Sequence, residues 1–133
     1  MIKIPALAII IIALFFSACS SKKTANTDVE VADVFVKSLN NNKFDEAEKY
    51  LLHDKTNMEY FDITKKNMLN KAVNELDAYK NANLIIHETK PQGDTITFIN
   101  YSNSNKLSQS NNLKLVKING QWLVDLKFTF LNK

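Results

Sequence analysis

The sequence predicts an α+β domain in which three helices come first and a four-stranded antiparallel sheet follows. Between residues 27 and 80, apolar residues recur at intervals of three and four, the spacing of one helix face. From Asn83 onward, apolar and polar residues alternate with a period of two, as in a half-buried strand. Two turn signals, Pro91-Gln92-Gly93-Asp94 and Asn119-Gly120, divide this second part into strands. Residues 27–133 are therefore expected to form one small domain.

The first eighteen residues are typical of a secretory signal peptide. Lys3 gives a positive start, and an apolar run of thirteen residues spans positions 4–16. As a helix, this run would reach only about 20 Å, which is shorter than the hydrocarbon core of a bilayer. We therefore expect residues 1–18 to be a cleaved leader rather than a permanent anchor.

The only cysteine of the chain, Cys19, directly follows this leader. Phe16-Ser17-Ala18-Cys19 resembles the lipobox of bacterial lipoproteins, which usually has leucine in place of Phe16. The resemblance implies that diacylglycerol is attached to the sulfur of Cys19, and that the chain is cut before this residue. Two other interpretations stay open: cleavage after Ser20, which would release a soluble secreted domain, and an uncleaved anchor.

A lipid on Cys19 would make the membrane a partner of this protein. Each buried methylene contributes about 0.8 kcal/mol, so two or three acyl chains give stable anchoring. Residues 19–26 would form a short tether, whose last seven residues reach at most about 23 Å when extended. Serine follows the cysteine, and the first acid is Asp28. In lipoproteins of Gram-negative bacteria, this pattern favours the outer membrane, with the domain facing the periplasm.

The first two helices are predicted from signals at their amino ends. Thr27 and Glu30 match a capping box, and an apolar stripe follows them. Asp45 and Glu48 match a second capping box, and this shorter helix is expected to end near His53.

The later elements follow from periodicity and turn residues. A third helix is expected over residues 62–80, whereas residues 54–61 are ambiguous. The expected strands are residues 84–90, 95–102, 113–118 and 122–130. Residues 103–112 are either a loop or the frayed start of the third strand. In the last strand, one side presents Trp122, Val124, Leu126, Phe128 and Phe130.

Three segments carry a resemblance to a known superfamily: Val36-Lys37-Ser38-Leu39-Asn40, Lys43-Phe44-Asp45-Glu46-Ala47 and Asn119-Gly120-Gln121-Trp122-Leu123-Val124-Asp125. Together with the order of elements, they resemble the nuclear-transport-factor-two-like superfamily. More narrowly, the chain is similar to small bacterial lipoproteins with that domain. Over residues 27–130 the resemblance implies a cystatin-like cone, in which helices cover a curved sheet. It implies fold rather than activity, since this fold hosts enzymes, transport factors and non-catalytic modules.

Composition argues against several function classes. The net charge is only +3, and all 17 basic residues are lysine, so bidentate arginine contacts to phosphate or guanine are absent and nucleic acid is not an expected partner. Only two glycines occur, too few for a phosphate-binding loop. With Cys19 lipidated, no thiolate ligand and only two histidines remain, and neither a metal nor another cofactor is expected.

An enzyme is the alternative hypothesis: a hydrolase, dehydratase or isomerase with a pocket inside the cone. Ketosteroid-isomerase-like members of the superfamily use an acid or histidine as base and a tyrosine as hydrogen-bond donor. The weak pocket candidates here are His87 and Asp125, with Tyr101 as donor, but no family motif surrounds them. If the last strand turns its apolar stripe toward the helices, large side chains fill the pocket and Asp125 points to solvent.

The second face of the predicted sheet is the expected binding surface. It would gather Ile85, His87, Ile99, Tyr101, Val116, Ile118 and Leu123. This face is more apolar than a solvated sheet face, which indicates a homodimer or a protein partner in the cell envelope. A register slip of one residue would exchange the two faces. The preferred function is therefore a membrane-anchored envelope lipoprotein that acts as a non-catalytic binding module of unknown ligand.

Overall fold

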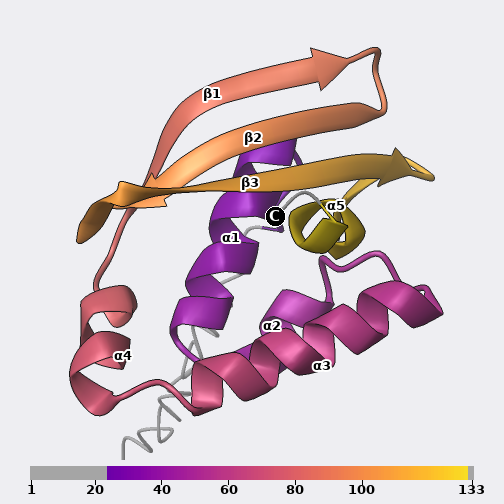
Figure 1. Cartoon of the computed structure of the whole chain (residues 1–133). Helices are drawn as coiled ribbons and strands as arrows, with labels where there is room; N and C mark the ends of the chain where they lie inside the picture. Colours follow the sequence, from indigo (N-terminus) through magenta and orange to yellow (C-terminus); the bar gives the residue numbers. More distant parts are fainter. Residues whose placement is uncertain (1–23, 132–133) are drawn as a thin grey trace, which may run out of the picture.

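The structure is a computed structural model that describes residues 24–131, without the side chains of the last two. The predicted signal peptide, the predicted lipidation site Cys19 and residues 20–23 of the predicted tether lie outside the described residues. The helices are α1 (Asp28–Asn40), α2 (Phe44–Glu48), α3 (Lys55–Leu69), α4 (Val73–Lys80) and α5 (Leu126–Leu131). The strands are β1 (Leu84–Gln92), β2 (Ile96–Asn103), β3 (Lys106–Ile118) and β4 (Gln121–Asp125). Figure 1 shows their arrangement.

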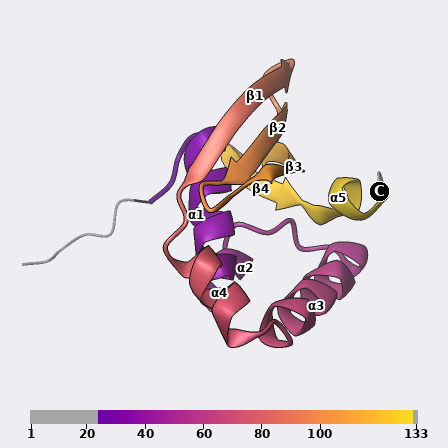
Figure 2. The same cartoon turned by 60° about the vertical axis from the view of Figure 1, so that its left-hand side comes forward.

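The fold is α+β, with a four-stranded antiparallel sheet in the order β1-β2-β3-β4. Helix α1 contacts all four strands and also α2, α3 and α4. The sheet and α3 lie at opposite ends of the domain, with α1 between them (Figures 1 and 2). The coarse class predicted from the sequence is therefore confirmed, whereas the number and limits of the elements differ from the prediction.

The core forms where α1 meets the sheet. Phe35 of α1 and Phe61 of α3 are both fully buried, with ring centroids 6.4 Å apart. The other buried core residues are Val31, Ala32, Val36, Ala47, Leu51, Ile99, Leu113, Leu115, Val124 and Leu126. Burial of large side chains contributes about 1.5–3 kcal/mol each, so this cluster is the main source of stability.

Helix α1 begins as the sequence predicts. The Glu30 amide donates to Thr27 Oγ1 and the Thr27 amide donates to a Glu30 carboxylate oxygen, both at 3.2 Å. The predicted second capping box is wrong, because α2 begins after Lys43 and has no side-chain cap. Helix α2 also ends at Glu48, so His53 lies beyond it.

The predicted third helix is in fact two helices. The ambiguous stretch forms the start of α3, where the carboxylate of Asp54 accepts from the Asn57 amide at 2.9 Å. Residues 70–72 then separate α3 from α4. Phe61 and Met68, which are two turns apart, are the apolar anchors of α3. The prediction failed because an Asx cap and a short break carry little periodic signal.

Both predicted turns are present in the sheet. Asn119 and Gly120 have φ values of 51° and 78°, as a two-residue hairpin requires, and Gly93 has a φ of 62°. In the Ser/Asn-rich stretch 103–112, Asn103 ends β2, residues 104–105 form a turn and residues 106–112 belong to β3.

The predicted last strand is wrong beyond Asp125, where the chain turns into α5. The Leu126 amide donates to Asn57 Oδ1 at 2.7 Å, and the Leu126 side chain is buried in the core. This contact with α3 diverts the chain from the sheet. Phe128 instead packs against Phe98, with ring centroids 4.8 Å apart and ring planes tilted by 60°.

Candidate functional site

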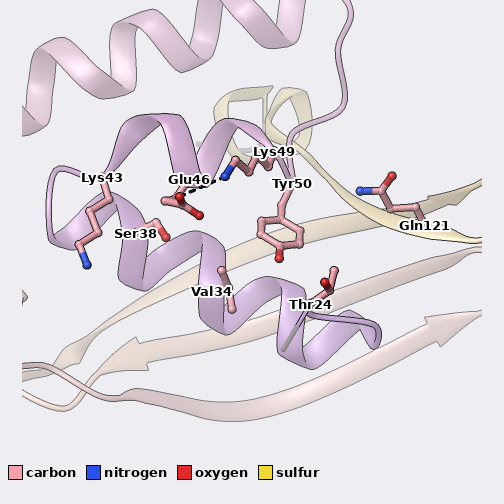
Figure 3. A pocket seen from close by; sticks show the side chains of 8 residues that line it. All are labelled: Thr24, Val34, Ser38, Lys43, Glu46, Lys49, Tyr50 and Gln121. Carbon is pink, nitrogen blue, oxygen red and sulfur yellow. Dashed lines mark hydrogen bonds and ion pairs between the residues drawn. The ribbon is translucent and has the colours of Figure 1, made fainter. Parts of the chain in front are cut away.

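A groove of about 490 Å³ lies between α1 and α2, next to residues 24–26, which precede α1. It is lined by Thr24, Val34, Ser38, Lys43, Glu46, Lys49, Tyr50 and Gln121. Figure 3 shows α1 and α2 running side by side, with Gln121 reaching the far end from β4. Three parts of the chain thus form one recess.

Local sequence explains how the groove is built. The Lys43 amide donates to the Ser38 carbonyl at 2.8 Å, which folds α2 back against α1. Asn42 supplies a positive φ of 56° in this turn, a conformation that asparagine tolerates. Ala47 of α2 is fully buried, so the other, polar side of that helix reaches the groove.

Most side chains that line the groove are polar, and Val34 is the aliphatic one. The Lys49 ammonium lies 3.1 Å from the Glu46 carboxylate, as the dashed line in Figure 3 marks. The Ala25 amide donates to the Tyr50 hydroxyl at 3.5 Å, which ties the segment before α1 to the residues that follow α2. Hydroxyl, ammonium and carboxylate groups around Val34 suit the binding of a small polar or zwitterionic group.

The residues of the predicted interaction face do not share one surface. Ile99 is fully buried in the core, and Tyr101 packs against it, where burial raises the pKa of the Tyr101 hydroxyl. Val116 pairs with Ile96 and Leu123, which places it on the opposite face.

Ile85 and Ile118 are exposed large apolar residues, at 38% and 43%. The prediction put Ile99 and Tyr101 on the wrong face. Ile99 pairs with Leu113 rather than sharing a face with Val116, and the bulge at His87 sets Ile86 opposite Tyr101, which separates Ile85 from both residues.

The two pocket candidates lie apart. His87 sits at the bulge of β1, with Nε2 2.9 Å from Ser102 Oγ. Asp125 is in β4, at the opposite edge of the sheet, so three strand spacings of about 4.8 Å each, roughly 14 Å in total, separate their strands. The structure therefore does not bring them to one substrate atom.

Asp125 is not solvated, contrary to the expectation from the sequence. It is 5% exposed, and its carboxylate lies 3.5 Å from the Lys114 ammonium and 3.6 Å from the Lys127 ammonium. The reason is α5, whose Lys127 folds back over the end of β4.

A polar cluster that the sequence did not indicate joins α3 to α5. The Lys127 ammonium donates to Asp54 Oδ2 at 2.5 Å, and this hydrogen bond is the main cause that lowers the pKa of Asp54 to about 2. The same bond raises the pKa of Lys127. Asn57 is fully buried and donates to Asp54 at 2.9 Å. An aspartate before a helix is a common cap signal in a sequence, and Asp54 is such a residue. No local pattern, however, pairs Asp54 with Lys127, which lies 73 positions later.

Comparison with protein-family models, with curated proteins and with solved structures gave no match. Among the described helices, none combines the length and apolar character needed to cross a membrane. Within residues 24–131, the His, Cys, Asp and Glu side chains form no group of three that could hold a metal ion.

Proposed function

We propose that this chain is a lipid-anchored lipoprotein of the bacterial cell envelope, and that its α+β domain is a non-catalytic binding module. The domain is assigned to the cystatin-like cone of the nuclear-transport-factor-two-like superfamily. Its location is the outer membrane, with the domain in the periplasm. Its ligand or partner binds on the outside of the domain, at the groove between α1 and α2.

Support for the anchor comes from the sequence. The only cysteine follows a leader that is too short for a permanent span, and its residues match the lipobox pattern. The groove begins at Thr24, five residues after Cys19, so at most about 18 Å of extended chain separates it from the anchor. A ligand bound there would be held close to the membrane surface.

The filled interior is the observation that carries the binding function. Phe35, Ile99 and Leu115 meet between α1 and the sheet, each fully buried. In a cone enzyme this space would hold the substrate, whereas here close packing occupies it. Binding at an outer surface is therefore favoured over the alternative, a hydrolase, dehydratase or isomerase with an internal pocket.

The anchor is tested in cells by comparing the native chain with Cys19→Ser. We expect the native chain to incorporate palmitate, to accumulate as precursor with globomycin and to pellet with membranes, and the variant to do none of these. An unmodified mature terminus in the culture fluid would refute the anchor.

The binding surface is tested with a photo-crosslinking amino acid. We expect a defined adduct when it replaces Lys49 in the groove, and none when it replaces the exposed Lys80 at the end of α4. The same adducts from both positions would contradict the groove. Loss of the cellular phenotype in His87→Ala, with the fold intact, would favour the enzyme.

A further inference from the structure

The face of the sheet that turns away from α1 carries an apolar patch. Leu115 and Val124, which pair with each other, are fully buried on the α1 side. Side chains alternate along a strand, so the residues between such buried positions point to the opposite face. Four apolar residues on that face form what we call the outer patch: Ile96, Val116, Ile118 and Leu123. Ile118 is 43% exposed, and the other three are partly exposed.

The outer patch is continuous and lies at one end of the sheet. Val116 pairs with Ile96 on one side and with Leu123 on the other. Ile118 follows Val116 by two residues on the same strand, and therefore lies on the same face. It directly precedes the turn of the β3–β4 hairpin at Asn119. A contiguous apolar group on a solvated sheet face indicates a contact surface.

The β3–β4 hairpin also carries positive charge. Residues 113–124 contain Lys114 and Lys117 but no acid. The Lys114 ammonium lies 3.5 Å from the Asp125 carboxylate, whereas the Lys117 ammonium lies 5.7 Å from the centroid of the Trp122 ring. Trp122 is the only tryptophan of the chain. Lysine and tryptophan beside aliphatic side chains are typical of protein surfaces that touch the head-group region of a membrane.

The predicted tether enters the domain next to this hairpin. Thr24 of the tether and Gln121 of β4 line the same groove, at the end away from Lys43 (Figure 3). Gln121 pairs with Ile118 of the outer patch. Thr24 lies five residues after Cys19, which is at most about 18 Å of extended chain. A lipid on Cys19 would therefore hold the outer patch within reach of the bilayer surface.

We propose that the outer patch and Lys117 lie against the surface of the membrane that holds the lipid anchor. The aliphatic side chains enter the boundary between head groups and acyl chains, and the Lys117 ammonium stays among anionic head groups. This contact depends on the proposed function, because four side chains alone are too few to keep the protein on a bilayer. It fixes the orientation of the domain, so that the groove between α1 and α2 opens beside the lipid surface.

A fluorescent label at position 121 tests this contact. The full chain with Gln121→Cys is produced with its lipid, purified in detergent and reconstituted in vesicles of phosphatidylethanolamine and phosphatidylglycerol. The alkylated sulfur of Cys19 does not react, so a thiol-reactive NBD label attaches only to the introduced cysteine. The matched control is Asn67→Cys. Asn67 is also an exposed amide residue, and it belongs to α3, which lies at the opposite end of the domain from the sheet (Figures 1 and 2).

In vesicles, we expect the label at position 121 to emit at shorter wavelength than the label at position 67. A nitroxide on the lipid head group should quench the label at position 121 several-fold more strongly. Adding Ile118→Ser and Lys117→Glu to Gln121→Cys should remove this excess while circular dichroism stays native.

Flotation of the protein with the vesicles, together with the mass of its amino terminus, reports the anchor separately. Equal quenching at both positions in a protein that floats overturns the contact and leaves the anchor intact. A protein with an unmodified Cys19 that does not float refutes the anchor, and this proposal with it.

Discussion

Asn57 of α3 offers the sharpest test of the contact that joins α3 to the start of α5. Its side chain is fully buried, its Oδ1 accepts from the Leu126 amide at 2.7 Å, and its Nδ2 donates to Asp54 at 2.9 Å. Asn57→Ala removes both bonds at once. The Leu126 amide lies within a residue that is only 3% exposed, so the variant leaves a buried donor without an acceptor.

The size of the loss follows from these contacts. A buried unsatisfied donor costs about 1–3 kcal/mol, and the lost hydrogen bond to the Asp54 carboxylate adds about 1 kcal/mol after screening. We therefore expect Asn57→Ala to lower the free energy of unfolding by about 2–4 kcal/mol in urea titration. This is a large share of the 5–15 kcal/mol that is typical of a domain.

Asn67→Ala is the matched control, because Asn67 lies on the same helix and is exposed. Alanine is the better helix former, so this variant should be neutral or slightly more stable. If Asn57→Ala unfolds within about 0.5 kcal/mol of Asn67→Ala, water satisfies the Leu126 amide and the reasoning is wrong.

Three further predictions concern charge, backbone and core. The pKa of Asp54 is lowered to about 2, so its pairing stabilises the fold at pH values above the unfolded pKa of 3.8, and this stability is lost as pH falls toward 2. In Lys127→Met, the free energy of unfolding from urea titrations should therefore fall less steeply between about pH 4 and pH 2. The same fall in both proteins would argue against the pair. Gly120 has a φ of 78°, so Gly120→Ala should cost about 1 kcal/mol or more, measured by urea midpoint, and no shift would contradict a strained turn. Phe35→Ala should cost about 3–5 kcal/mol in thermal unfolding, because the residue is fully buried, and a loss below 1 kcal/mol would mean that the core refills the space.

The sequence by itself determined the elements whose signals are local. The capping box at Thr27 and Glu30 and the hairpin at Asn119-Gly120 depend on bonds and φ values within a few residues, and both are present. The class of fold followed from the change of period near residue 83. The lipidation of Cys19 is likewise predicted from adjacent residues, and it stays a prediction because Cys19 lies outside the described residues.

Only the tertiary structure decided where distant segments meet. The turn of the chain at Leu126 depends on Asn57, 69 residues earlier, and overrides an alternating pattern that by itself predicts a strand. The faces of the sheet depend on which residues pair across the strands and on the bulge in β1, since an inserted residue exchanges inside and outside. The groove joins α1 and α2 to Gln121 of β4, and no local period encodes that meeting. Hydrogen bonds between near neighbours can be predicted from the sequence, whereas long-range contacts depend on how the whole domain packs.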